Sequence, residues 1–245
     1  MKPLRKIPLF VKVLYTLFAI VHITMNWRVY GPLNLLWFCD VALVVTGIAL
    51  WTESRLLLSI EAVAIMIPMG LWGVDLIGRL VTHHYIFGFA GYMFDPHVPR
   101  NIRVLSWFHI WMPPLLIAAL FRLGYDRRAL WIQCIVVTVQ LTACWFISSP
   151  PPMKNPRDAV NINWVYGTGS EHAQHAMPAW AYLVTEIVLF QLLIYIPSHF
   201  LLCWTFSQPG GCVYRLASRR SKPVARVVNG NSSEPQPGSV HVKAI

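Results

Sequence analysis

Charged residues are scarce in this chain of 245 residues, and their scarcity narrows the class of protein. Only 12% of the residues are Asp, Glu, Lys or Arg, whereas a soluble domain usually contains about a quarter. In contrast, 56% are hydrophobic and 11 are Trp. Few charges combined with long apolar runs are typical of a membrane protein, in which lipid is the solvent for most of the surface.

The sequence also lacks any cysteine pattern typical of a disulfide framework or of a structural zinc site. It contains 5 Cys, an odd number, and no CxxC pair. Most of them lie within apolar runs, where Cys commonly serves as a small apolar residue. We therefore expect no disulfide, no bound metal and no cofactor.

Six apolar segments are about 19 residues or longer, and about 20 residues cross the hydrocarbon core as a helix. These candidate spans are 8–27, 32–51, 55–78, 104–122, 129–148 and 178–205. The first follows the basic segment MKPLRK but has no small-residue cleavage site, so it is predicted to be a span and not a signal peptide. The sequence predicts an all-α fold, a transmembrane bundle with about six spans in residues 1–206.

Basic residues are distributed unevenly between the two sides of this predicted bundle. If the N-terminus lies inside, 14 of the 20 Lys and Arg fall on the inner side, which predicts that both termini are cytoplasmic. This asymmetry accounts for the net charge of +10 without a nucleic-acid partner. Residues 207–245 are rich in Ser, Pro, Gly and Arg, which predicts a disordered basic cytoplasmic tail. We expect a multi-pass protein of the cell membrane whose partners are membrane lipids; the sequence leaves the oligomeric state open.

Polar residues within the spans concentrate at one depth. An Asp at the centre of a span costs about 2.5–3.5 kcal/mol, so such residues usually face a partner or a water-filled cavity. In the predicted orientation, seven of them fall in one layer of the outer leaflet: His22, Cys39, Asp40, Asp75, His109, Cys144 and Glu186. Two of these, His22 and Asp75, are also near enough to span ends to reach the headgroups. The others favour a shared internal site.

Within this layer, Cys39 and His109 are the residue types of a nucleophile and its general base. The adjacent carboxylate of Asp40 would disfavour a thiolate. Consecutive residues on a helix diverge by about 100°, however, so Asp40 can face a different partner. Two arrangements follow from the sequence: Asp40 orients His109, or it pairs with His22.

Two predicted outer loops, 82–103 and 148–177, are long and rich in histidine. The histidines with no assigned role are His83, His84, His97, His172 and His175. The HAQH segment has the i, i+3 spacing that places two imidazoles on one helical face, as metal sites require. The sequence favours the other reading, histidines on a solvated loop at the membrane surface. A metal-dependent membrane enzyme is one alternative function.

Four segments give the chain a resemblance to a known family. They are PLNLLWFCDVAL with Cys39, WFHIW with His109, the loop NINWVYG, and MPAWAYLVTEIVLFQLLIYIP with Trp180 and Glu186. Over about residues 30–200, their order and spacing resemble the YwaF-type bacterial integral membrane proteins, which are six-span proteins related to eukaryotic phospholipid acyltransferases. The resemblance implies that Cys39 and His109 match the Cys–His pair that transfers acyl chains between lipids.

The leading hypothesis is therefore a membrane-embedded transferase that moves acyl chains on lipids. Cys39 would be the nucleophile and His109 the general base, while Asp40 or Glu186 would orient the imidazole. Four residues are expected to bind substrate, the first two by closing the site from outside: Asn163, Tyr166, Trp180 and Asp75. The alternative is a lipid-binding protein or proton-coupled carrier that performs no chemistry and uses the same polar layer.

Overall fold

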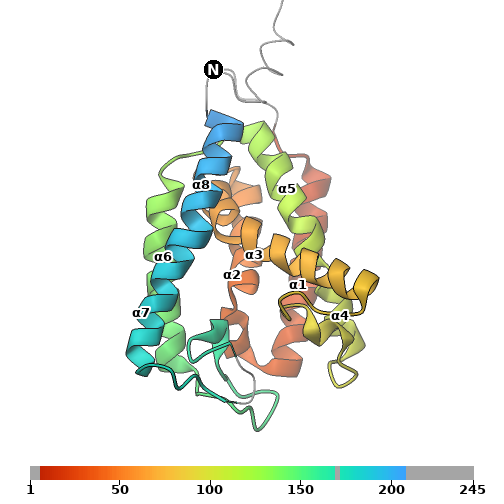
Figure 1. Cartoon of the computed structure of the whole chain (residues 1–245). Coiled ribbons are helices and arrows are strands. Elements are labelled where there is room, and N and C mark those ends of the chain that lie inside the picture. Colours follow the sequence, from red (N-terminus) through yellow and green to blue (C-terminus); the bar gives the residue numbers. More distant parts are fainter. Residues whose placement is uncertain (1–5, 169–171, 208–245) are drawn as a thin grey trace, which may run out of the picture.

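The computed structural model describes residues 6–168 and 172–207, and within these residues the fold is helical, with one isolated β-bridge between Ser149 and Val160 (Figure 1). The α-helices are α1 (Leu9–Tyr30), α2 (Phe38–Thr52), α3 (Arg55–Thr82), α4 (Arg100–Leu105), α5 (Phe108–Leu123), α6 (Ala129–Ile147), α7 (Ala179–Leu189) and α8 (Ile196–Leu202). The 3₁₀ turns are η1 (Pro32–Leu36), η2 (Gly91–Phe94) and η3 (Ile162–Trp164), and the π-helical segments are η4 (Phe190–Tyr195) and η5 (Cys203–Ser207). The predicted tail, 207–245, lies outside the described residues except for Ser207.

The other helices pack around α3, which runs obliquely across the bundle and extends beyond it at one side (Figure 1). The start of α1 and the end of α8 lie at the same end of the bundle, which we name the tail end. The long connections before α4 and before α7 lie toward the opposite end, which we name the loop end. In its most apolar stretch α3 is 56% buried, against at most 33% in the other long helices, so it is the central helix.

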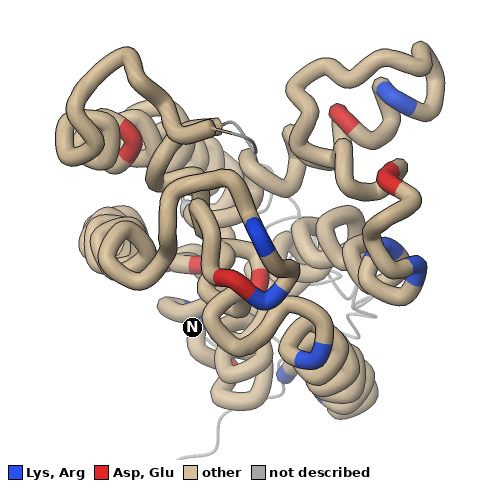
Figure 2. Tube along the Cα trace, turned by 90° about the horizontal axis from the view of Figure 1, so that it is seen from below, with Lys and Arg blue, Asp and Glu red and all other residues tan. Residues whose placement is uncertain are grey.

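Five helical stretches are long and apolar enough to cross a membrane: Leu9–Tyr30, Arg55–Thr82, Arg100–Leu123, Ala129–Ile147 and Ala179–Phe206. Their outward faces are apolar. On α6, Trp131, Ile135, Val139 and Phe146 form one stripe, and each is at least 64% exposed. Seen from the loop end, acidic and basic residues are sparse along the chain (Figure 2). Apolar stripes on the outside of a bundle indicate a membrane protein, because in water they would be buried.

The second predicted span, 32–51, is interrupted in the structure. It consists of η1 and the 15-residue helix α2, which are separated at Trp37, where the backbone is extended (φ −58°, ψ 141°). Helix α2 alone rises only about 22 Å, less than the roughly 30 Å of a hydrocarbon core. By length the structure supports five spans, and the sixth stays a prediction.

A side chain from a distant loop satisfies the backbone at this interruption. The N–H of Phe38 donates to Oδ1 of Asn163 (2.9 Å), and Nδ2 of Asn163 donates to the carbonyl of Leu36 (2.9 Å). Gln140 of α6 donates to the same carbonyl (3.0 Å). Buried backbone groups are rarely left unpaired, so these bonds allow the helix to break inside the bundle.

The last predicted span is one continuous helix whose hydrogen bonding changes from α-helical to π-helical and back. Helix α7 continues through the π-helical segment η4 into α8, where Pro197 follows directly. Proline has no N–H to donate and its ring displaces the preceding turn, which accounts for the wider π-turn before it.

Ion pairs join the connections at the tail end. Lys12 of α1 contacts Glu53, which caps α2, at 2.7 Å. Between α5 and α6, the carboxylate of Asp126 accepts hydrogen bonds from Arg128 (2.9 Å) and Arg55 (3.4 Å). The hydrogen bonds from Arg128 lower the pKa of Asp126 to about 2. These contacts lie outside the apolar part of the bundle, where such charges are best accommodated.

Candidate functional site

The predicted polar layer divides into three groups in the structure. One group surrounds His22 and Asp40, a second surrounds Glu186 and Cys144, and the third is Asp75 with the loop that it binds. The first group, which we name the His–Asp centre, contains His22, Asn26, Asp40 and the adjacent His109 and Cys39.

The centre is built on a short hydrogen bond between α1 and α2. Nε2 of His22 lies 2.6 Å from Oδ1 of Asp40, and the two side chains are only 4% and 11% exposed. The amide of Asn26, one turn along α1, lies 3.1 Å from the same imidazole nitrogen. The structure therefore pairs Asp40 with His22, one of the two arrangements that the sequence left open, and not with His109.

Aromatic rings enclose the imidazole of His22. Phe18 stacks on it with a centroid distance of 5.9 Å, and Phe108 meets it edge to face at 4.9 Å. Nδ1 of His22 is buried and has no hydrogen-bond partner within the described part of the chain. One ring nitrogen of His22 therefore contacts the carboxylate, while the other remains able to donate or to accept a hydrogen bond.

His109 lies beside this pair but has its own partners. Its ring stacks on Trp72 with a centroid distance of 4.6 Å, and its Nδ1 lies 2.8 Å from the carbonyl oxygen of Ser106. A carbonyl only accepts, so Nδ1 carries the proton and Nε2 is left as an acceptor. His109 is close enough to Asp40 and His22 to interact with both electrostatically.

Cys39 is partly exposed at the start of α2. In residues 6–168 and 172–207, its thiol makes no side-chain hydrogen bond, neither to His109 nor to His22. It interacts electrostatically with Asp40. The structure thus brings the predicted nucleophile to the edge of the centre without forming the predicted Cys–His pair.

Tyr92 of η2 is a member of the site that the sequence did not reveal. Burial raises the pKa of its hydroxyl, and electrostatic interaction with Cys39 and Asp40 raises it further. Its ring is 6.4 Å from that of Trp72. The one signal in the sequence was the aromatic residues of the 82–103 loop, which indicate no particular partner.

Glu186 belongs to the second group and does not orient either imidazole. Glu186 is only 8% exposed, and its Oε2 is buried without a hydrogen-bond partner among the described residues. It interacts electrostatically with Cys144 and with Tyr182 of its own helix. Asn163 joins this group to the interrupted span, because its Nδ2 lies 3.3 Å from the sulfur of Cys144.

Two of the residues expected to bind substrate are engaged with backbone. Asn163 is 1% exposed, and its amide bonds the break in the second span. The hydroxyl of Tyr166 donates to the carbonyl of Trp145 at 2.6 Å. The NINWVYG loop therefore closes the bundle at the loop end, and we name it the plug. The Asn163 amide and the Tyr166 hydroxyl are used in these hydrogen bonds and are not free for a ligand.

The other two expected substrate residues also have different surroundings. Asp75 is fully buried, and its carboxylate accepts the N–H groups of Ile86, Phe87, Gly88 and Ala90 at 2.8–3.1 Å. It therefore anchors the loop that carries Tyr92. Trp180, at the start of α7, is 65% exposed and lies on the outer surface of the bundle.

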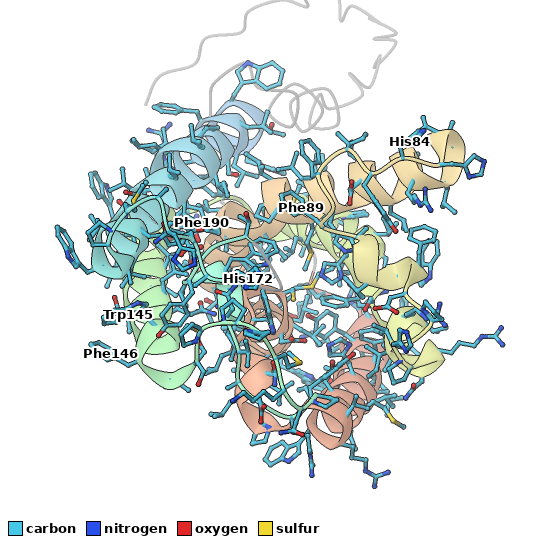
Figure 3. All side chains as sticks on the ribbon, turned by 60° about the horizontal axis from the view of Figure 1, so that its bottom comes forward. His84, Phe89, Trp145, Phe146, His172 and Phe190 are labelled. Atoms are coloured by element: carbon cyan, nitrogen blue, oxygen red, sulfur yellow. The ribbon has the colours of Figure 1, made fainter. Side chains whose placement is uncertain are left out.

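The loop histidines are dispersed. His84 lies at the tip of α3, whereas His172 lies over the middle of the molecule (Figure 3). All five, His83, His84, His97, His172 and His175, are exposed. Among the described residues, no three His, Cys, Asp or Glu side chains are grouped so that they could hold a metal ion.

No family model, curated protein or solved structure gives a significant match to this chain.

Proposed function

We propose that this protein is a proton-coupled carrier of the cell membrane in which the His22–Asp40 pair binds the proton. The observation that carries the proposal is the 2.6 Å contact between two buried ionisable side chains on adjacent helices of an apolar bundle. Ionisable residues within spans are costly, and they typically mark proton relays or substrate pathways. Imidazole is also the side chain whose charge changes most readily near neutral pH.

Another buried carboxyl group lies nearer the tail end than the His–Asp centre. Glu61 lies on the central helix α3 and is 5% exposed. It interacts electrostatically with Tyr15, whose hydroxyl donates to the carbonyl of Leu43 at 2.8 Å. Tyr15 precedes His22 on α1 by about 10 Å of helix. Ionisable groups at two depths are what a proton pathway through the bundle requires.

Proton entry into liposomes tests the proposal directly. The purified protein is reconstituted with a pH-sensitive dye inside, and the external pH is lowered while valinomycin and potassium remove the membrane potential. We expect Asp40→Asn and His22→Gln to reduce proton entry to the rate of empty liposomes. Asp95→Asn, a carboxylate in a loop at the same end, is the matched control and should behave as wild type. Equal rates for wild type and Asp40→Asn would falsify the proposal.

Acyl transfer is the second candidate, favoured by the position of Cys39 beside the His–Asp centre and by the family resemblance. The thiolate would attack an ester carbonyl of a phospholipid, which forms a thioester and breaks the ester bond. The imidazole would pass the thiol proton to the departing alcohol, and an acceptor hydroxyl would then release the acyl chain and restore the thiol. This reaction requires the Cys39 side chain to approach His22 or His109 more closely than in the described structure.

A search for an acylated cysteine tests this second candidate. The purified protein is incubated with phospholipid, and its peptides are analysed by mass spectrometry for a thioester at Cys39. Cys144→Ala serves as the control, because its buried thiol is bonded to Asn163 and should not be acylated. If Cys39→Ala leaves the acyl composition of cellular lipids unchanged and no thioester forms, acyl transfer is excluded.

The orientation of the bundle belongs to the same proposal. We infer that both termini are cytoplasmic, which the excess of basic residues on that side supports. The shared location of the two ends of the described chain is consistent with an even number of crossings (Figure 1). Reporter fusions at Arg127 and Lys154 should report inside and outside, respectively.

A further inference from the structure

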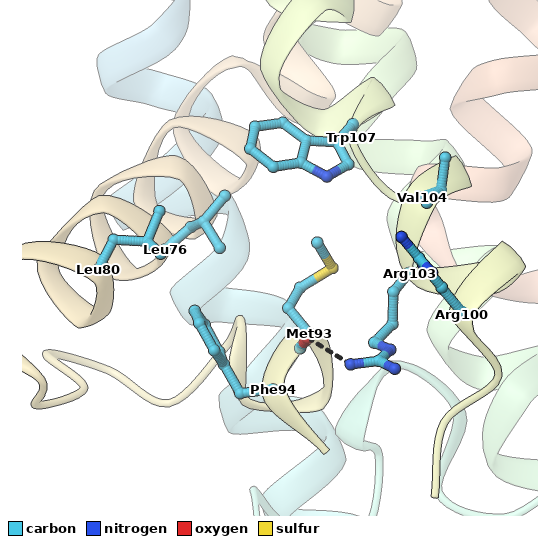
Figure 4. A pocket seen from close by; sticks show the side chains of 8 residues that line it. All are labelled: Leu76, Leu80, Met93, Phe94, Arg100, Arg103, Val104 and Trp107. Atoms are coloured by element: carbon cyan, nitrogen blue, oxygen red, sulfur yellow. Dashed lines mark hydrogen bonds between the residues drawn. The ribbon is translucent and has the colours of Figure 1, made fainter. Parts of the chain in front are cut away.

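A pocket of about 250 Å³ opens on the flank of the bundle, between the end of α3, η2, α4 and the start of α5 (Figure 4). Its walls are mostly apolar. Leu76 and Leu80 of α3 form one side, and Phe94 and Trp107 contribute aromatic rings. Leu80 and Trp107 are about half exposed, so the apolar wall is continuous with the outer surface of the bundle.

Two arginines face this apolar pocket from α4. Arg100 and Arg103 are three residues apart, which places them on one face of the helix, and both line the pocket (Figure 4). Neither forms an ion pair with an acidic side chain in the part of the chain that the structure describes. The pocket therefore holds positive charge without a countercharge from the protein.

The guanidinium of Arg103 is incompletely bonded. Its Nη1 donates to the carbonyl of Met93 at 3.4 Å, while its Nε is buried and has no hydrogen-bond partner within the described residues. The neighbouring acid, Asp95, bonds within its own loop through the N–H of His97 (2.8 Å). A buried charged donor without a partner is costly, so an anion in the pocket would stabilise Arg103.

The position of the pocket indicates the kind of anion. Arg100 and Arg103 lie at the start of the stretch Arg100–Leu123, where a membrane-crossing helix meets the headgroup region. Arg79, in the last turn of α3, stacks on Tyr85 (4.8 Å) and on Phe94 of the pocket wall (5.7 Å), and it adds positive charge nearby. Cations above an apolar wall at this depth match a lipid phosphate above its acyl chains.

We propose that this pocket binds one anionic phospholipid, with its phosphate between Arg100 and Arg103 and an acyl chain along Leu76, Leu80 and Trp107. The site is separate from the His–Asp centre and does not depend on the proposed function. Planar guanidinium groups suit phosphate because they donate two parallel hydrogen bonds.

Binding of short-chain lipids to the delipidated, purified protein tests the proposal. Native mass spectrometry measures binding of dioctanoyl phosphatidylglycerol, dioctanoyl phosphatidylcholine and glycerol phosphate, which lacks acyl chains. We expect phosphatidylglycerol to bind in a one-to-one complex. The other two should bind at least about tenfold more weakly, because each lacks either the charge or the acyl chains, and losing a charged hydrogen bond or an apolar contact lowers the affinity by about that factor.

Substitutions locate the site. Arg100→Gln should weaken phosphatidylglycerol binding about tenfold, and the double change with Arg103→Gln should abolish it. Arg28→Gln, an exposed arginine in the last turn of α1 that does not line the pocket, is the matched control. Because Arg100 is exposed and its side chain makes no hydrogen bond among the described residues, we expect its single substitution to preserve the fold. Unchanged binding in Arg100→Gln, equal binding of phosphatidylcholine, or tight binding of glycerol phosphate alone would each overturn the proposal.

Discussion

Replacing Asn163 tests whether the plug at the loop end holds the interrupted span in place. Asn163→Ala removes the acceptor of the buried Phe38 N–H, and an orphaned buried donor costs about 1–3 kcal/mol. Asn163 also has a left-handed backbone (φ 58°), which disfavours alanine by about 1 kcal/mol. The carbonyl of Leu36 keeps Gln140 as a partner. We therefore expect a loss of about 2–4 kcal/mol in the free energy of unfolding.

The assay is unfolding of the purified protein in mixed micelles with increasing SDS. Asn163→Gly removes the same hydrogen bonds but tolerates the left-handed backbone, so it should be about 1 kcal/mol less destabilised than Asn163→Ala. Asn101→Ala, an exposed position on α4, is the control and should unfold as wild type. Neutral surface substitutions change the free energy of unfolding by about 0.5 kcal/mol. If Asn163→Ala changes it by no more than that, the backbone groups at the Trp37 interruption have other partners and the reasoning is wrong.

Three further predictions follow from contacts described above. Asp75→Ala should free the four backbone N–H groups that the carboxylate binds. Amide hydrogen exchange should then accelerate in the loop after α3 and not in α6. Unchanged protection of that loop would contradict the anchoring role of Asp75. The pKa of Asp126 is about 2 in the folded protein, below its ordinary 3.8, so its stabilisation is present above about pH 4 and is lost as the pH falls toward 2. Melting temperatures should show this acid-dependent loss, and Arg128→Gln should diminish it. A small maleimide should label Cys39, a partly exposed residue, faster than Cys144, a fully buried residue, and peptide mass spectrometry would measure the two rates.

Long apolar runs made most of the fold predictable. The central helix was expected over 55–78 and extends over Arg55–Thr82, and the span expected over 129–148 is α6, Ala129–Ile147. Continuous hydrophobicity is sufficient for such helices, because the membrane imposes both their length and their hydrogen bonding. The helical class, the bundle and the apolar exterior follow from that pattern alone.

The second span was harder to predict because its interruption depends on a distant residue. The stretch 32–51 is apolar throughout, and the residues around Trp37 contain no strong helix breaker. The break is stable only because Asn163, 125 residues away, bonds the free backbone groups. Local sequence does not contain that information, so the segment was predicted to be a continuous helix.

The candidate site was predictable in its depth but not in its pairing. Positions along the predicted spans put His22, Asp40 and His109 at similar depths, because the rise per residue is fixed in a helix, and the structure brings these three near one another. Which imidazole meets Asp40 depends on how each helix is rotated about its axis, and that depends on packing. The ring of His109 instead stacks on Trp72 and bonds to Ser106.

The bond between Asn163 and the interrupted span also determines the order in which the protein can be assembled during synthesis. When Phe38 leaves the ribosome, the chain that will pair its N–H has not been translated, so the second segment enters the membrane without its final partner. It can settle only after α6 and the following loop have emerged, because the loop must close over more than a hundred residues. A chain that stops before residue 163 would leave the N–H of Phe38 without this partner, so we expect truncated products to be less stable in the membrane than the full chain.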